Sequence, residues 1–243
     1  MPRRPADALF AEPRLAACYD TFDGERDDLD HYQQILAELG ARTVIDLGCG
    51  TGSLAVRLAA DGLAVTAVDP ALASLDVARG KPGAERVTWV LGSAEDLPAL
   101  GADAAVMTGN VAQVLVDEAD WTSTLRALHA ALRRGGALVF ESRRPEARAW
   151  TRWQAATEAT HLLPGVGRVI TRPVRLEVDL PLVTFEDAYL FADGTTLTSA
   201  STLRFRSEQE LRESVTAAGF TVEEIRQAPD RPGQEFVLIA RAN

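Results

Sequence analysis

Cysteine and histidine are scarce in this chain, which limits the chemistry that it can support. The 243 residues include two cysteines, Cys18 and Cys49, and three histidines. Two cysteines cannot form a disulfide framework, and no histidine stands at metal-ligand spacing from a cysteine. We therefore expect a cytoplasmic protein that holds no metal.

Long apolar runs and clustered positive charge are also missing. No run approaches the length of a membrane span, and the opening "MPRRPADALF" lacks the apolar core of a signal peptide. The chain carries 25 Lys and Arg against 35 Asp and Glu, a formal net charge of −10. Because phosphate backbones are bound by clustered basic residues, we expect neither a nucleic-acid nor a membrane partner.

Strand-like and helix-like patterns alternate between residues 43 and 142. The runs "TVIDLG", "AVTAVD", "VTWVLG", "AAVMTG" and "ALVFES" are almost continuously apolar, as in parallel strands that are covered on both faces. Helical patterns lie between these runs. The alternation predicts an α/β fold with a Rossmann-like, doubly wound sheet and right-handed crossovers.

The pattern changes after residue 143. "VRLEVDL" (174–180) alternates apolar and charged residues, and two further β-like runs follow with Asp193-Gly194 as a hairpin turn between them. We predict an antiparallel β insert whose apolar face carries Val174, Leu176, Val178, Phe185, Tyr189 and Phe191. An apolar face of this kind must be covered, either by packing over a substrate site or by a second copy in a dimer. Of these two alternatives, we favour the cover over a substrate site. The protein is expected to be a monomer or a homodimer.

Both ends of the chain contain further elements. "DDLDHYQQILAELG" (27–40) has the spacing of an amphipathic helix, and Ser207 and Glu210 form a capping box at the start of a late helix. Two closing strands would complete a mostly parallel, seven-stranded sheet. The predicted organisation is an N-terminal helical lid (1–42), a Rossmann-like core (43–145), a substrate-side insert with antiparallel strands (146–206), and a C-terminal helix with closing strands (207–243).

The clearest chemical signal is a glycine turn followed by an acid. Gly48, Gly50 and Gly52 follow the first predicted strand, and Asp69 ends the second. Glycines let a ligand approach the backbone, and an acid at that place can accept both hydroxyls of a ribose. The spacing is not the dinucleotide G-x-G-x-x-G, and Asp46 would repel a pyrophosphate. The pattern therefore favours a nucleoside with a cationic group, such as S-adenosylmethionine.

Five segments together resemble a known family. In order and spacing, "VIDLGCGTGSLA", "AVDP", "LGSAEDLP", "DAAVMTGNVAQV" and "LRRGGALVFESR" are similar to the class I S-adenosylmethionine-dependent methyltransferases of the small-molecule type. The resemblance covers roughly residues 15–241. It implies transfer of a methyl group from S-adenosylmethionine to an N or O atom of a small-molecule acceptor. Enzymes that methylate nucleic-acid bases carry an Asn-Pro-Pro-Tyr type motif where this chain reads "TGNVAQV".

The resemblance also implies which residues bind the cofactor. The glycines would lie under the methionine part, Asp69 would bind the ribose, and Ser93 would accept from the adenine amino group where the family often has an aspartate. A tyrosine at the position of Tyr19 often closes over the cofactor. The implied cofactor contacts are Tyr19, Asp46, Gly48, Cys49, Gly50, Gly52, Asp69, Pro70, Ser93, Ala94, Thr108 and Asn110.

The catalytic group is not fixed by the resemblance. The sulfonium is already a good leaving group, so such an enzyme mainly aligns the reactants and excludes water. The candidates for a base or a substrate contact are His161, Glu141, Arg143 and Tyr19, although Glu141 and Arg143 also suit an ordinary ion pair. Two other functions stay open from the residues alone, namely a non-catalytic S-adenosylmethionine-binding regulator and a nicotinamide oxidoreductase.

Overall fold

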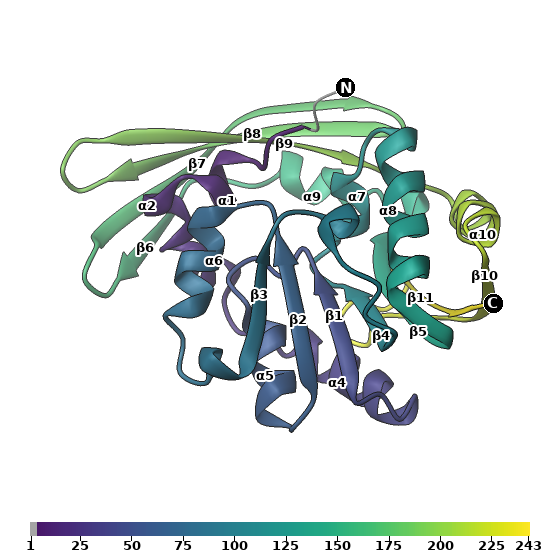
Figure 1. Ribbon diagram of the computed structural model, residues 1–243. Helices are drawn as coiled ribbons and strands as arrows, with labels where there is room; N and C mark the ends of the chain where they lie inside the picture. Colours follow the sequence, from purple (N-terminus) through teal and green to yellow (C-terminus); the bar gives the residue numbers. More distant parts are fainter. Residues whose placement is uncertain (1–3) are drawn as a thin grey trace.

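The computed structural model describes residues 4–243, so the first three residues of the predicted lid lie outside the described residues. Figure 1 shows two β-sheets. Sheet A has seven strands in the order β10-β11-β5-β4-β1-β2-β3, and sheet B has four in the order β6-β7-β8-β9. The strands of sheet A are β1 (Thr43–Leu47), β2 (Ala64–Asp69), β3 (Val87–Leu91), β4 (Ala102–Met107), β5 (Leu132–Arg143), β10 (Phe220–Arg226) and β11 (Glu235–Ala242).

Sheet A confirms the predicted doubly wound fold. The strands β1 to β5 pair in parallel, β11 pairs antiparallel with β5, and β10 pairs antiparallel with β11. The central strands β1 and β4 are buried along almost their whole length. This burial on both faces is why their sequences are continuously apolar rather than alternating.

Helices cover both faces of sheet A (Figure 1). The helices α4 and α5 pack on one face with Val44 and Ala67, whereas α8 and α10 pack on the other with Leu138 and Phe140. Within residues 4–243, no helix is both long and apolar enough to cross a membrane. The helices are α1 (Ala8–Ala11), α2 (Pro13–Ala16), α3 (Tyr19–Asp23), α4 (Asp28–Glu38), α5 (Ser53–Ala60), α6 (Leu72–Arg79), α7 (Val111–Val114), α8 (Glu118–Ala131), α9 (Trp150–Gln154) and α10 (Glu208–Ala217), with 3-10 turns η1 (Ala84–Arg86), η2 (Ala94–Asp96) and η3 (Pro145–Ala147).

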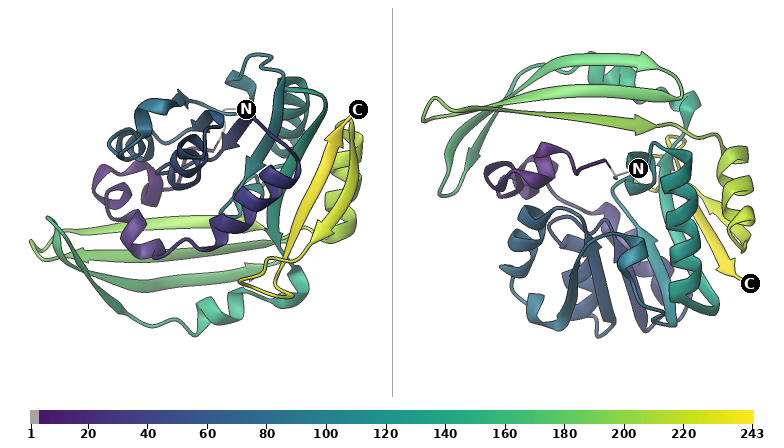
Figure 2. Two further views of the ribbon diagram at one scale, coloured as in Figure 1. Left: turned by 90° about the horizontal axis from the view of Figure 1, so that it is seen from below. Right: turned by 45° about the horizontal axis from the view of Figure 1, so that its top comes forward.

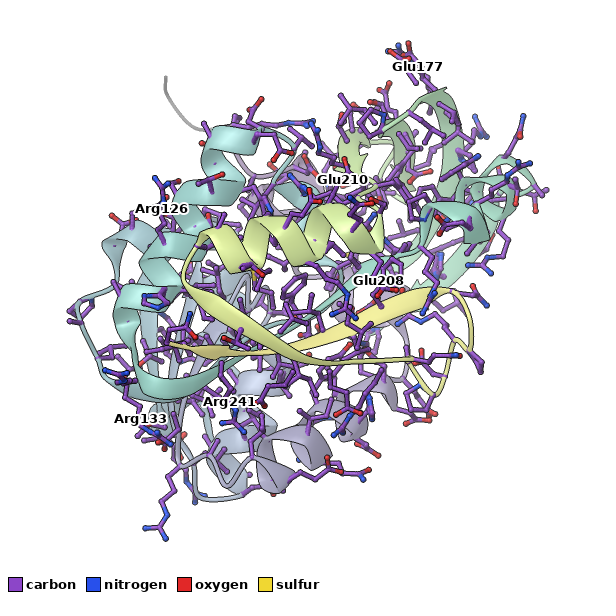
Figure 3. The ribbon with its side chains drawn as sticks, turned by 90° about the vertical axis from the view of Figure 1, so that its right-hand side faces the viewer. Arg126, Arg133, Glu177, Glu208, Glu210 and Arg241 are labelled. Atoms are coloured by element: carbon purple, nitrogen blue, oxygen red, sulfur yellow. The ribbon has the colours of Figure 1, made fainter. Side chains whose placement is uncertain are left out.

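The predicted capping box of α10 is present. The carboxylate of Glu210 accepts from the backbone N–H of Ser207 at 2.7 Å and from its hydroxyl at 2.8 Å. The Ser207 hydroxyl in turn accepts from the N–H of Glu210. Figure 3 shows α10 lying across the closing strands of sheet A, with Glu208 and Glu210 in its first turn. Acidic side chains at that end are favoured by the helix dipole.

The antiparallel insert is confirmed, with one more strand than the sequence indicated. Its strands are β6 (Ala159–Leu163), β7 (Gly167–Asp179), β8 (Leu182–Phe191) and β9 (Thr196–Arg204). In Figures 1 and 2, sheet B extends across the carboxyl ends of the parallel strands, with α1 and α2 between the two sheets. The helix α2 and the residues after it pack on sheet B in one apolar cluster, which includes Leu15, Cys18, Val169 and Tyr189.

The predicted apolar face of the insert needs one correction. Leu176 pairs with Phe185, and Thr171 pairs with Tyr189, so an extra residue lies in β7 between these pairs. The resulting register shift falls at Pro173–Arg175, and Val174 is 55% exposed there. The extra residue breaks the alternation at Val174, which has no partner on β8, so strict alternation does not predict its exposed side chain.

The end of β7 differs from the rest of the sheet. The strand β6 pairs only with residues 167–171 of β7, so the last part of β7 has no neighbouring strand on that side. Val178 is 44% exposed there, although its register places it on the same face as Leu176. Figure 3 shows Glu177 pointing away from the body of the protein. The predicted face is therefore covered only where the N-terminal helices and α9 lie beneath it.

Gly52 directly precedes α5 and packs closely against Trp89 and Ala78. Its φ is +78°, and a Cβ at this position would lie 2.5 Å from the Trp89 ring and 2.9 Å from Ala78. Gly62 also has a positive φ, of +89°, but a Cβ there would meet nothing within 4 Å. The two glycines separate the effect of backbone strain from the effect of steric overlap.

We predict that Gly52→Ala destabilises the protein more than Gly62→Ala does. The left-handed backbone alone should cost Gly62→Ala about 1 kcal/mol, and the overlap with Trp89 should raise the loss in Gly52→Ala to about 2–4 kcal/mol. Urea unfolding at neutral pH measures both values, with the slope checked for constancy. Equal losses in the two variants would contradict the close packing at Gly52.

Candidate active site

A cavity of about 270 Å³ lies at the carboxyl ends of the parallel strands. Its wall is formed by the loops that follow β1, β2, β3 and β4, and Phe10 and Tyr19 of the N-terminal helices close it on another side. The rings of Phe10 and Tyr19 lie 5.1 Å apart. Open α/β sheets bind ligands at this edge because the loops there diverge. The fold therefore places the cavity where the sequence predicted a ligand.

The glycine turn forms one side of the cavity. Gly50 lines it with φ +53°, and a Cβ on Gly50 would meet no atom within 4 Å, so this position faces open space. A Cβ on Gly48, by contrast, would lie 2.4 Å from Val111. Gly52 does not line the cavity and packs on Trp89 instead. Of the three predicted contacts, Gly48 and Gly50 are at the wall, and Gly52 serves the packing of α5.

Asp46 brings an unpaired carboxylate to the cavity. The residue is 1% exposed, and among the described residues neither carboxylate oxygen has a hydrogen-bond partner of good geometry, with only weak support from the N–H of Ala55. Burial, followed by the charge of Asp69, raises the pKa of Asp46 to about 7. A buried anion without a partner is unfavourable unless a cation binds to it.

Arg26 lines the same cavity and opposes the charge of Asp46. Its guanidinium pairs with Asp23 and Asp28 at 2.8 Å each, and its positive charge lowers the pKa of Asp46. Burial lowers the pKa of Arg26 itself, but its bonds to Asp28 and Asp23 outweigh burial and raise it overall. Because carboxylates bind ammonium groups and guanidinium groups bind carboxylates, this part of the cavity suits an α-amino acid zwitterion.

Asp69 joins the glycine turn to the end of β2. One oxygen accepts from the N–H of Gly50 and the other from the N–H of Ala71, both at 2.8 Å. Asp69 is 7% exposed and lines the cavity, and each oxygen keeps a further lone pair for a ligand hydroxyl. Burial raises the pKa of Asp69, and the two backbone bonds oppose this rise.

Ser93 follows β3 on the same wall. Its hydroxyl donates to Asp96 at 2.8 Å, so the hydroxyl oxygen remains able to accept a hydrogen bond from a ligand. Asp96 also accepts from the backbone N–H of Ser93 at 2.8 Å, which fixes the loop. The acceptors of Asp69 and Ser93 therefore line the same cavity as Asp46 and Arg26.

Asp20 ties α3 to the start of α5. Its carboxylate accepts from the Thr51 hydroxyl at 2.5 Å and pairs with Lys81 at 2.6 Å. Lys81 also donates to the Ser53 hydroxyl at 3.1 Å. These bonds hold the helix that carries Tyr19 against the glycine turn, so Asp20 acts as a latch for this wall of the cavity.

Asn110 comes directly after Thr108 and Gly109 in the sequence, but its side chain belongs to a buried polar network. It is 2% exposed, with φ +63°, and its backbone N–H donates to Glu141 at 2.9 Å. Its side-chain amide donates to Glu141 and, at 3.1 Å, to Glu235. Arg231 pairs with Glu235 at 3.0 Å. The network holds Asn110 in a left-handed conformation behind Thr108 and Gly109, which line the cavity.

Glu141 is an unusual member of this network. It is 1% exposed, and burial, followed by the charge of Glu235, raises its pKa to about 7. Such a pKa would suit a general base, but Glu141 does not line the cavity. Its visible function is to orient Asn110.

The structure separates the other catalytic candidates. His161 lies on β6, where its Nε2 is 3.1 Å from the Thr171 hydroxyl and its ring packs on Phe22. Arg143 donates to Gln113 at 3.0 Å and lies over the Trp153 ring, outside the cavity wall. Only Tyr19 of the four lines the cavity, and burial raises the pKa of its phenol. The phenol of Tyr19 therefore keeps its proton at neutral pH.

Most of the predicted cofactor contacts meet at one place. Gly52 and Asn110 are the two that the structure does not bring to the cavity wall. Sequence reasoning missed Arg26, which a single-sequence pattern does not distinguish from any surface arginine, and Glu235, which reaches the network from the last strand. The predicted residues that line the cavity are Tyr19, Asp46, Gly48, Cys49, Gly50, Asp69, Pro70, Ser93, Ala94 and Thr108.

Comparison with known proteins identifies the domain. Residues 44–136 match the family model described as a methyltransferase domain. An uncharacterised methyltransferase of Mycobacterium tuberculosis is 35% identical over 150 residues, which are 60% of this chain and 55% of that protein. The chain thus spans about half the length of the curated relatives that it matches.

Two solved structures show the same fold along the whole chain. The sugar N-methyltransferase KedS8 from Streptoalloteichus has a TM-score of 0.79 at 18% identity, covering 100% of this chain and 97% of that one. The CcbJ methyltransferase from Streptomyces caelestis has a TM-score of 0.77 at 22% identity, covering 98% and 99%. Residues 44–136 are thus similar to a methyltransferase domain, and the whole chain shares the fold of these solved methyltransferases.

We predict that Asp20→Asn loosens α3. Loss of the charge on a half-exposed pair should cost about 0.5–1 kcal/mol, so amide hydrogen exchange in residues 19–23 should become about two- to fivefold faster. Asp76→Asn, which breaks the exposed pair with Arg79 on α6, is the matched control and should leave that exchange unchanged. Unchanged exchange in Asp20→Asn would show that apolar packing alone holds α3.

The raised pKa of Glu141 predicts a pH dependence of stability. A carboxyl whose pKa rises on folding stabilises the protein while it is protonated, and this contribution is lost as the pH rises toward 7. In Glu141→Gln, the slope of unfolding free energy against pH between 5 and 7 should be shallower by roughly 1 kcal/mol per pH unit. Urea unfolding at several pH values measures this slope. Glu146→Gln, an exposed charge, should keep the wild-type slope.

Proposed function

We propose that this protein transfers the methyl group of S-adenosylmethionine to a nitrogen or oxygen atom of a small-molecule acceptor. The observation that carries the proposal is the distribution of charge in one cavity. Asp46 and Arg26 suit the amino acid part of the cofactor, and Asp69 and Ser93 offer acceptors to its nucleoside part. Gly50 supplies the open floor that such a ligand needs.

In this proposal, the residues of the chain align the methyl donor with the acceptor and exclude water from the cavity. S-adenosylmethionine, when bound, supplies a methyl group on a positively charged sulfur that is a good leaving group. Tyr19 and Phe10 cover the cavity, and the Asp20 latch keeps them in place. Thr108 and Gly109 line the cavity and are held from behind by Asn110. In this proposal residues 1–42 act as a lid and residues 146–206 carry the acceptor side.

Acceptors differ in what they require of the protein. An unprotonated amine attacks the methyl carbon with its free electron pair as the carbon–sulfur bond breaks, and the product carries the positive charge on nitrogen. A hydroxyl group must also lose its proton to a base. Among the four candidates from the sequence, only Tyr19 lines the cavity, and its phenol retains its proton. This arrangement supports a nitrogen acceptor over an oxygen acceptor.

Cofactor binding is predicted to depend on pH through Asp46. The ligand ammonium pairs with the ionised carboxylate, and the pKa of Asp46 is about 7, so affinity should fall as the pH decreases. Calorimetric titration with S-adenosylhomocysteine should show about tenfold weaker binding at pH 6 than at pH 8. Asp46→Asn should bind about ten- to a hundredfold more weakly at pH 8, with little dependence on pH.

Two controls make this experiment specific. Glu141→Gln removes the other carboxyl with a pKa of about 7, which lies outside the cavity wall, and should keep the pH dependence of binding. A nicotinamide dinucleotide should not bind. Binding of that dinucleotide in preference to S-adenosylhomocysteine would reject the proposal. Cofactor binding without methyl transfer to any acceptor in a cell extract would favour the non-catalytic regulator, which the comparisons do not support.

A further inference from the structure

The inward face of sheet B carries one carboxylate among buried apolar side chains. Alternate residues of β8 share that face, and of these Val183 is fully buried while Tyr189 and Phe191 are each 5% exposed. Asp187 lies on the same face, between Phe185 and Tyr189 along the strand. Its neighbours on the adjacent strands are Pro173 of β7 and Ser199 of β9.

Asp187 has no partner within the described part of the chain. Neither a hydrogen bond nor an ion pair reaches its carboxylate, and the hydroxyl of Ser199 already accepts from the N–H of Leu9. Burial raises the pKa of Asp187, and no nearby positive charge lowers it. Both carboxylate oxygens nevertheless remain accessible to a ligand, because neither of them is fully buried.

Several other buried carboxylates in the described part of the chain have a side-chain partner, whereas Asp46, like Asp187, has none. Asp7 accepts from the Ser201 hydroxyl, Asp28 pairs with Arg26, and Glu235 pairs with Arg231. Each of these bonds offsets part of the unfavourable burial of a carboxylate. Asp187 lacks such a bond, so its presence on an inward face is unexplained by folding stability.

The residues on either side of Asp187 along this face of β8 are aromatic, and both rings pack on other rings. The ring of Phe185 lies 5.3 Å from that of Trp153, and the ring of Tyr189 lies 5.5 Å from that of Phe22. Tyr189 is also within electrostatic reach of Tyr19, which lines the cofactor cavity. Tyr189, the neighbour of Asp187 on this face, therefore lies near Tyr19 at the cavity, and no residue of sheet B is part of the cavity wall itself.

We propose that Asp187, with the rings of Phe185 and Tyr189, binds a protonated amine group of the acceptor, so that the acceptor is an amine-bearing small molecule. The inference rests on the proposed methyl transfer and narrows its substrate class. A carboxylate between aromatic rings attracts a cation through both the charge and the ring faces. A neutral alcohol gains neither of these two interactions. The net charge of −10 also favours the approach of cations.

The matched test compares two neighbouring residues of β8. Asp187→Asn removes a charge from the inward face, and Glu186→Gln removes the same charge from the outward face. The probes are benzyltrimethylammonium, a cation that cannot accept a methyl group, and benzyl alcohol as its neutral counterpart. Binding to protein saturated with S-adenosylhomocysteine is followed by tryptophan fluorescence, because Trp153 contacts Phe185.

Wild-type protein and Glu186→Gln should bind the cation with dissociation constants within twofold of each other. Asp187→Asn should bind it at least tenfold more weakly, and benzyl alcohol should bind equally weakly to all three proteins. Absent binding to the wild type, or the same loss in both variants, would overturn the proposal. With labelled S-adenosylmethionine, benzylamine should pass one ammonium proton to the Asp187 carboxylate and then accept a methyl group through its freed electron pair as the carbon–sulfur bond breaks. The rate should fall in Asp187→Asn, and benzyl alcohol should not accept a methyl group.

Two further measurements separate this inference from its premise. Asp187→Asn should bind S-adenosylhomocysteine as the wild type does, because Asp187 does not line the cofactor cavity. Failure of the wild type to bind that ligand would reject the proposed function, whereas failure to bind only the cation would reject the amine site. The melting temperature of Asp187→Asn should equal or exceed that of the wild type, and a marked decrease would indicate a structural role instead.

Discussion

The carboxylate of Asp69 connects two loops on which the rest of the site depends. The N–H groups of Gly50 and Ala71 donate to its two oxygens, and these groups belong to the turn after β1 and the loop after β2. The bonds hold the turn against the end of β2 with Gly50 open to the cavity. The start of α5 follows from that turn, and the Asp20 latch is attached there through Thr51.

Several acids around the cavity are left without full compensation. Asp46 and Glu141 each have a pKa of about 7 because burial disfavours their ionised forms, and the charge of a second acid adds to the effect. Burial alone raises the pKa of Asp187. Unpaired acids lower the stability of the empty protein, but they leave binding energy for cationic ligands. Asp46 and Asp187 are in places where such ligands would meet two different parts of the site.

The N-terminal helices and sheet B form one packed unit. Leu15 and Cys18 lie in the same apolar cluster as Val169 and Tyr189, and α3 is also latched to the core through Asp20. A movement of α3 away from the cavity would therefore disturb contacts with sheet B. This coupling links the N-terminal helices at the cavity to the surface that carries Asp187.

The sequence by itself determined the parallel sheet, the glycine turn and most of the cavity wall. These features depend on local spacing, because strand periodicity, turn glycines and an acid at a strand end lie within short segments. The capping box of α10 was predictable for the same reason. The family resemblance added a predicted role for Ser93, whose hydroxyl donates to Asp96 at the cavity wall in the folded protein.

Only the tertiary structure decided which polar residues meet. Glu235 comes from the last strand to face Glu141 and Asn110, and this pairing turns a candidate base into a residue that orients a loop. The bulge in β7 left Val174 unpaired and exposed, and Gly52 packs on Trp89 instead of lining the cavity. Each outcome depends on contacts between segments far apart in the chain. Side-chain burial and register across such distances are set by packing, which no local pattern encodes.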